Sequence, residues 1–128
     1  MILALIIQTL FNLLNAGYDA WRFNTGRKPM HWLNFLLYLI IIGLSCWYCF
    51  TGNIVQVALL AISALCNRQL FFDIPLNWRR GLRWDYVSPE RASFIDRIEY
   101  LVFGNNGQAP VVIYLLVWVL STGVMFLI

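Results

Sequence analysis

Charge is what this sequence lacks most. Only 12% of its 128 residues are charged and 61% are hydrophobic, whereas roughly a quarter of the residues in a soluble domain are charged. A soluble fold of this length could not cover so much apolar surface with polar side chains. The composition therefore predicts that lipid replaces water over part of the surface, in one membrane domain that covers residues 1–128.

Residues that usually carry catalysis or bind metal are also scarce. The one histidine, His31, predicts neither a haem ligand pair nor a metal cluster. The sequence contains no glycine-rich phosphate loop, HExxH, GxSxG or selectivity-filter motif. We therefore expect a protein that is not an enzyme and that holds no metal and no cofactor.

The three cysteines leave one alternative to this expectation. Cys46 and Cys49 have the CxxC spacing of redox dithiols, and Cys66 stands apart from them. Membrane thiol oxidoreductases exchange electrons with a second cysteine pair, and no positive charge adjoins Cys46 or Cys49 to favour the thiolate. Redox chemistry through this pair is therefore the less favoured hypothesis, and no disulfide framework is indicated.

Long apolar runs are what the sequence has in abundance. Four of them match the thickness of a bilayer and run over about residues 1–21, 30–50, 53–72 and 110–128. The first run lacks the basic segment that precedes the apolar part of a signal peptide, so we expect a retained helix. The sequence predicts an all-α integral membrane protein, built as a four-helix bundle.

The basic residues predict the orientation of these spans. Arg22, Arg27 and Lys28 follow the first span, and the other six basic residues lie between residues 68 and 97. With four spans, both groups fall on the same side of the membrane, which the positive-inside rule assigns to the cytoplasm. We therefore expect both termini outside and the connector 73–109 in the cytoplasm. The six are Arg68, Arg79, Arg80, Arg83, Arg91 and Arg97.

The connector itself alternates aromatic rings with arginines, a pattern suited to anionic phospholipid headgroups. Its five acidic residues offset five of the six arginines between residues 68 and 97, so we expect no nucleic-acid binding. From Ser88 to about Phe103 the apolar residues share one helical face, which predicts an amphipathic interfacial helix before the last span. The predicted headgroup contacts are Trp78, Arg79, Arg80, Arg83 and Trp84.

Polar side chains recur at helical spacing within three of the spans. In the first span they are spaced by four, three and four residues, so they share one face of a helix. Such a polar seam on an otherwise apolar helix is expected to face protein or water rather than lipid. The seams comprise Gln8, Asn12, Asn15 and Asp19 in the first span, Asn34 and Tyr38 in the second, and Gln56, Ser63 and Asn67 in the third.

Two interpretations of the seams remain open. They could line a water-filled path or a ligand cavity, or they could form the interhelical hydrogen bonds that fix the packing. Amides dominate and Asp19 is the single acid, so the packing interpretation is favoured. Asp19 also lies three residues before Arg22, and pairing with a nearby arginine explains it more simply than an ion site does.

Spaced residues of the segment 68–99 are similar to those of small uncharacterised multi-pass proteins of Bacteroidota and their phages. The resemblance covers about a quarter of the chain and implies a bacterial inner membrane, but it transfers no functional residue. It is carried by Arg68, Phe72, Asp73, Asn77, Gly81, Tyr86, Ser93, Asp96 and Arg97.

Small size, polar seams and the lack of a catalytic set lead to two hypotheses of function. The first is a self-associating bundle that forms or supports a membrane pore, with holin-like permeabilisation as one version. The second is an accessory subunit that docks on a larger membrane complex through its seams. The expected partners are therefore the lipid bilayer and either further copies of the chain or a membrane complex.

Overall fold

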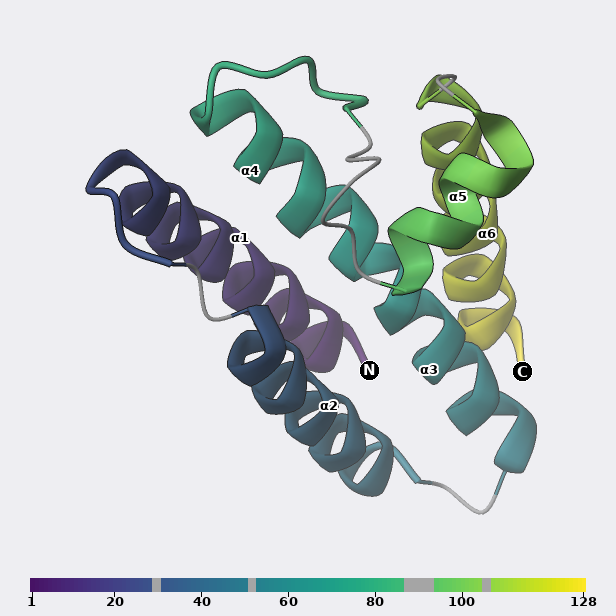
Figure 1. Ribbon diagram of the computed structural model, residues 1–128. Helices are drawn as coiled ribbons and strands as arrows, with labels where there is room; N and C mark the ends of the chain where they lie inside the picture. Colours follow the sequence, from purple (N-terminus) through teal and green to yellow (C-terminus); the bar gives the residue numbers. More distant parts are fainter. Residues whose placement is uncertain (29–30, 51–52, 87–93, 105–106) are drawn as a thin grey trace.

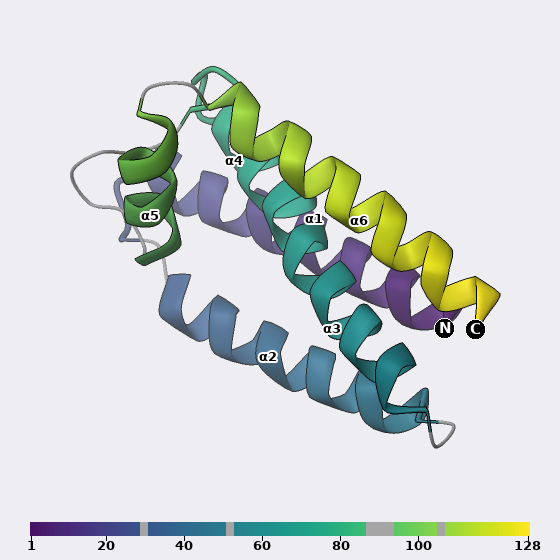
Figure 2. The ribbon, with the colours of Figure 1, turned by 90° about the vertical axis from the view of Figure 1, so that its right-hand side faces the viewer.

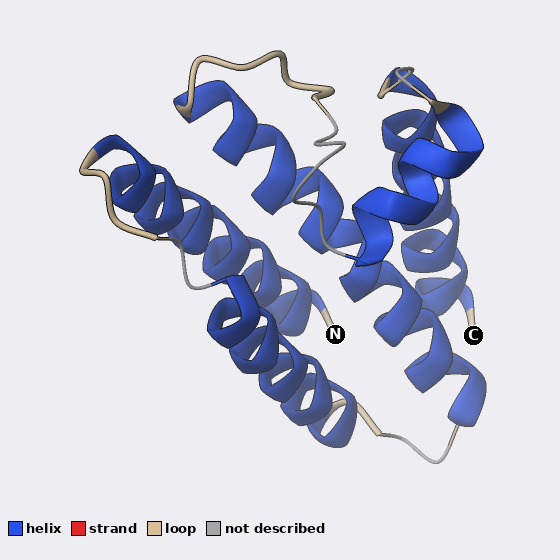
Figure 3. Ribbon diagram, viewed as in Figure 1, coloured by secondary structure: helices blue, strands red, loops and turns tan. Residues whose placement is uncertain are grey.

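The computed structural model describes residues 1–28, 31–50, 53–86, 94–104 and 107–128, and all regular structure within them is helical (Figures 1 and 3). The all-α class predicted from the sequence is thereby confirmed. The helices are α1 (Ile2–Asn24), α2 (His31–Tyr48), α3 (Ile54–Arg68), the π-helical segment η1 (Gln69–Asp73), α4 (Ile74–Arg79), α5 (Phe94–Phe103) and α6 (Gln108–Leu127).

Within the described residues, three helices are long and apolar enough to cross a membrane: α1, the continuous run Ile54–Arg79, and α6. α2 is apolar over Trp32–Tyr48 but shorter. The predicted four-helix bundle is not confirmed, because only three helices of the described part of the chain reach spanning length and they do not form a closed bundle. α6 packs along α3, and in the described part of the chain it makes no comparable packing with α1 or α2.

The third span is longer than the sequence predicts. Its helix continues from Ile54 to Arg79, whereas the prediction ends it at residue 72 and begins the connector at residue 73. Pro75 lies inside this helix, where its ring would collide with the carbonyl of Phe71 in a regular α-helix. η1 ends at Asp73, two residues before Pro75, and such local π-helical turns allow membrane helices to accommodate proline. Because the helix does not stop there, the connector begins after Arg79.

α1 runs alongside α3 and α4 in the same direction. Ala16 and Ala20 of α1 pack against Phe72 and Leu76 in one apolar cluster. Small side chains such as alanine let two helices approach closely in a membrane. Figures 1 and 2 show both termini at one end of the molecule, while the ends of α1 and α4 lie together at the other.

α5 accounts for the second half of the predicted interfacial helix and ends at Phe103 as predicted. Residues 88–93 of that prediction lie outside the described residues. α6 begins at Gln108, two residues before the predicted start of the last span. Gly107, which precedes α6, lies directly against the backbone carbonyl of Asp85, so the start of α6 is packed onto the segment after α4.

Candidate functional site

The polar seam of α1 faces the interior of the protein. The side chains of Gln8, Asn12 and Asp19 are fully buried, and Asn15 is partly buried. The outward positions of the same helix carry exposed apolar residues such as Leu10 and Leu14. From Gln8 to Asp19 the seam extends about 16 Å along the helix axis at 1.5 Å per residue.

Asn67 is the residue that joins this seam to α3. Its Oδ1 accepts a hydrogen bond from Asn12 Nδ2 at 2.9 Å, and its own Nδ2 donates to Thr9 Oγ1 at 2.8 Å. The Thr9 hydroxyl in turn donates to the carbonyl of Leu5 at 2.9 Å. Buried amides are costly in hydrocarbon unless they are paired, so these bonds fix how α1 and α3 face each other.

α2 joins the same interior through two further contacts. Asn34 Nδ2 donates to Asp19 Oδ1 at 3.0 Å, and the Tyr38 hydroxyl donates to the carbonyl of Ala64 at 2.6 Å. The Tyr38 ring also stacks on Phe11, with 6.0 Å between ring centroids. We call the set Gln8, Asn12, Asn15, Asp19, Asn34, Tyr38 and Asn67 the polar core.

Several polar atoms within this core have no hydrogen-bond partner among the residues that the structure describes. Neither amide atom of the fully buried Gln8 is bonded, and the same holds for Asn12 Oδ1 and Asn15 Nδ2. Polar atoms in a protein interior are almost always satisfied, by protein groups or by ordered water. Water with two to four polar neighbours is stable in such a site. The polar core therefore has the donors and acceptors to hold water or a small polar species.

Arg68 follows Asn67 in α3, and the prediction that the helix ends four residues after it, at residue 72, is wrong. It lies about halfway along the continuous helix Ile54–Arg79. Its guanidinium carbon is 4.2 Å from the ring centroid of Phe72 and 5.6 Å from that of Phe35 on α2. Its Nη1 is buried and has no hydrogen-bond acceptor in the described segments of the chain. The error follows directly from ending the helix too early.

The polar residues predicted to share one face of the third span divide between two neighbours. Asn67 contacts α1, whereas Ser63 shares a hydrogen bond of 2.8 Å with Thr122 of α6. Gln56 is partly buried near the start of α3. The prediction of one common seam is therefore only partly right, because positions four residues apart in the central helix α3 meet different helices.

The predicted headgroup residues lie near the end of the molecule where α1 and α4 terminate. Trp78 and Arg79 are exposed, and the Arg79 guanidinium lies against Gly17 of α1. The guanidinium carbon of Arg80 is 4.0 Å from the ring centroid of Phe23. Trp84 is exposed as well, and Arg83 forms a 2.9 Å ion pair with Asp85. Contact with phospholipid headgroups stays a prediction.

The CxxC pair lies at the end of α2 that leads toward α3. Cys46 and Cys49 are partly buried free thiols, and Cys66 is a buried free thiol in α3. Within the described side chains no group of three or more His, Cys, Asp or Glu could hold a metal ion. The expectations about redox chemistry and cofactors stay predictions.

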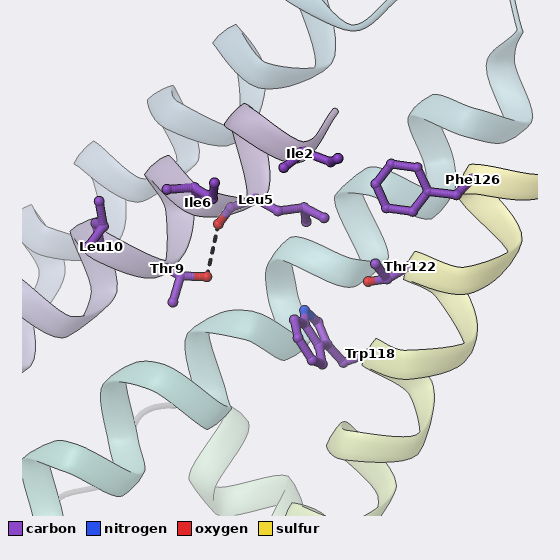
Figure 4. Close-up of a pocket in the computed structure, with 8 residues that line it drawn as sticks. All are labelled: Ile2, Leu5, Ile6, Thr9, Leu10, Trp118, Thr122 and Phe126. Carbon is purple, nitrogen blue, oxygen red and sulfur yellow. Dashed lines mark hydrogen bonds between the residues drawn. The ribbon is translucent and has the colours of Figure 1, made fainter.

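A cleft of about 350 Å³ lies between α1 and α6 and was not predicted from the sequence (Figure 4). The hydroxyls of Thr9 and Thr122 on its walls are already engaged by Asn67 and Ser63. The cleft therefore offers an almost wholly apolar surface. Its walls are formed by Ile2, Leu5, Ile6, Thr9, Leu10, Trp118, Thr122 and Phe126.

Thr9 and Arg68 are the interior residues that sequence reasoning missed. Thr9 precedes Asn12 by three positions, a spacing that places both on one helical face, so it could have been added to the seam. For Arg68 there was no such signal, because its place in the helix depends on where the helix ends.

In comparisons with known proteins, no family model, no curated protein and no solved structure matches this chain.

Proposed function

We propose that the protein is a small multi-pass membrane protein that self-associates and forms or supports a pore for small ions. The observation that carries this proposal is Gln8, fully buried with neither amide atom bonded, at one end of the polar core. Polar residues whose only role is to hold helices together would be expected to form hydrogen bonds with one another. Spare donors and acceptors inside an apolar exterior suit a hydrated path.

In this proposal α2 is a fourth membrane-crossing helix. Its 18 residues extend about 27 Å, close to the roughly 30 Å of a bilayer core. Both termini lie at one end, and Arg79 and Arg80 contact α1 toward the other. This arrangement supports a topology with both termini outside, which we propose for a bacterial inner membrane. Arg68 lies within the continuous helix rather than after it, so the proposed orientation rests on the other eight basic residues.

The pore is tested with purified protein in vesicles of phosphatidylethanolamine and phosphatidylglycerol. Vesicles loaded with potassium chloride and a graded series of dyes should lose ions but keep the dyes if the polar core is the path. Loss of large dyes as well would indicate the holin-like version, in which several copies surround a wider opening. Vesicles that retain their ions at high protein content would contradict both versions.

Pore formation is also tested in cells, by induced expression of the protein. A pore lowers the membrane potential soon after induction, measured with a potential-sensitive dye. The double variant Cys46→Ser and Cys49→Ser should lower the potential equally, because these thiols have no role in the proposed path. If only that variant lost the effect, the redox hypothesis would replace the present one.

The accessory-subunit hypothesis is favoured by a separate observation, the apolar cleft between α1 and α6. A transmembrane helix of another protein could fill it by apolar packing. Purification under native conditions followed by mass measurement decides between the two proposals. A stable homo-oligomer supports the pore, and stoichiometric recovery of one larger membrane protein supports the accessory role.

A further inference from the structure

We propose that the ends of α1 and α4 together form a binding site for the phosphate of an anionic phospholipid. The sequence predicts headgroup contacts only in the connector, whereas the structure brings the basic residues at the end of α1 beside those at the end of α4. This site does not depend on the proposed pore. We call its five cationic residues the basic junction: Arg22, Arg27, Lys28, Arg79 and Arg80.

Two arginines at the end of α4 reach across to α1. The guanidinium carbon of Arg80 is 4.0 Å from the ring centroid of Phe23. The Arg79 guanidinium occupies the space that a Cβ at Gly17 would fill. Phe23 itself packs on the apolar cluster that joins the two helices, and Figure 1 shows the ends of α1 and α4 close together. The charges of α4 therefore lie next to those at the end of α1.

Positive charge prevails at this end of the molecule. The segments 22–28 and 78–86 contain six basic residues and one acidic residue. That acid, Asp85, forms a 2.9 Å ion pair with Arg83, which is not part of the basic junction. In the described part of the chain, no ion pair joins a carboxylate to a residue of the junction. An anion from outside the protein can therefore neutralise these charges.

Two further acids precede the segments, and both lie deeper in the protein. Asp19 is fully buried and accepts a hydrogen bond from Asn34 at 3.0 Å. Asp73 is partly buried in η1, about 9 Å before Arg79 along the helix axis at 1.5 Å per residue. Even when both acids are counted, six basic residues face three acidic ones at this end.

The lengths of the two helices place the basic junction at the depth of lipid headgroups. α1 has 23 residues and the run Ile54–Arg79 has 26, which extend about 34 and 39 Å. The hydrocarbon core of a bilayer is about 30 Å thick and the headgroups bring it to about 40–45 Å. Trp21 and Trp78 are exposed beside these cations, and tryptophan is enriched in the headgroup layer.

Aromatic rings hold the guanidinium groups of α1 in place. The guanidinium carbon of Arg27 is 5.1 Å from the ring centroid of Trp21. Arg22 Nε donates to the carbonyl of Lys28 at 2.8 Å, which holds the segment after α1 against the helix end. A ring contacts the face of a guanidinium, whereas the N–H donors project from its edge and match phosphate oxygens. A phosphate bound here would be contacted from both helices and would hold α4 against α1.

The size of the effect follows from the number of charges. One lysine or arginine near an anionic membrane surface changes lipid affinity about fivefold. We therefore expect Lys28→Gln to weaken the binding of phosphatidylglycerol about fivefold, and the double variant Arg79→Gln and Arg80→Gln to weaken it about 25-fold.

The experiment titrates the purified full-length chain, in micelles of a nonionic detergent, with phosphatidylglycerol or phosphatidylcholine. Native mass spectrometry counts the bound lipids and gives their affinities. Wild type should bind phosphatidylglycerol about tenfold more tightly than phosphatidylcholine, or more. The variants Lys28→Gln and Arg80→Gln should lose affinity for phosphatidylglycerol alone, and Arg80→Lys should retain it because the charge remains.

Arg97→Gln is the matched control, because it removes the same charge as Arg80→Gln from another place. Arg97 is an exposed residue of α5, which packs on α6 and, among the described helices, on neither α1 nor α4. This variant should leave the affinity unchanged. Lys28 lies outside the described helices, so Lys28→Gln keeps the test valid if the double variant fails to fold.

Four results would overturn the proposed site. Equal affinities of wild type for the two lipids would do so whatever the variants show. Equal losses in Arg80→Gln and Arg97→Gln would replace a local site by the overall charge of the chain, and an unchanged affinity in Lys28→Gln would remove the share of α1. Displacement of the lipid by inorganic phosphate, beyond that caused by potassium chloride of equal ionic strength, would assign the site to a free phosphate ion. Vesicles that retain their ions would contradict only the pore.

Discussion

Replacing Asn67 by leucine should destabilise the protein because Asn67 joins α1 to α3 through two hydrogen bonds. Asn67→Leu keeps a similar side-chain size but removes the acceptor for Asn12 Nδ2 and the donor to Thr9 Oγ1, at 2.9 and 2.8 Å. Interhelical hydrogen bonds in membranes average about 0.6 kcal/mol and reach about 1.7 kcal/mol. Asn12 Oδ1 already lacks a hydrogen-bond partner among the described residues, so the variant would leave both amide atoms of Asn12 unbonded. A buried polar group left without a hydrogen bond costs about 1–3 kcal/mol. We expect a loss of about 1–3 kcal/mol in the free energy of unfolding.

The assay is reversible unfolding in mixed micelles at increasing mole fraction of sodium dodecyl sulfate, followed by circular dichroism. A double-mutant cycle with Asn12→Leu isolates the bond between the two amides. The double variant has apolar groups on both sides, so its loss should be smaller than the sum of the two single losses by about 0.6–1.7 kcal/mol. Strictly additive losses, or no loss in Asn67→Leu, would refute the hydrogen-bonded junction.

Two further substitutions test the packing, each by the same unfolding assay. Tyr38→Phe removes a hydroxyl that donates to a backbone carbonyl of α3 at 2.6 Å, and should lower the free energy of unfolding by about 0.6–1.7 kcal/mol. The control Tyr48→Phe, at an exposed position of the same helix, should leave it almost unchanged. Equal losses in the two variants would contradict the Tyr38 hydrogen bond. Gly107→Ala would drive a new Cβ into the backbone carbonyl of Asp85 and should cost about 1–3 kcal/mol. Gly43→Ala is the control, because its new Cβ meets no atom within 4 Å; the free energy of unfolding should rise by up to about 1 kcal/mol, since alanine favours the helix. A more stable Gly107→Ala variant would contradict the close packing of Gly107 on Asp85.

The polar side chains of the seams form their hydrogen bonds mostly with other helices of the same chain. Asn12, Asn34, Tyr38 and Asn67 bond to neighbouring helices of the same chain rather than facing outward. A second copy would therefore meet mainly exposed apolar surface, such as that of α6, of which only 17% of the most apolar window is buried. Self-association would then depend on van der Waals packing of apolar faces, as is general for membrane helices.

The sequence by itself determined the class of the protein and the inward face of α1. Long apolar runs with few charges specify membrane helices, and the spacing of Gln8, Asn12 and Asp19 specifies one face, since both are properties of a single helix. Such local patterns do not require knowledge of the neighbouring helices.

Only the tertiary structure decided which helix each polar face meets and how far the helix that contains Arg68 extends. Asn67 and Ser63 are four positions apart, yet one bonds α1 and the other α6, because α3 lies between them. The helix also passes Pro75 through a π-helical turn, which the local rule that proline ends a helix does not foresee. The helix therefore continues eleven residues beyond Arg68, which the composition does not reveal.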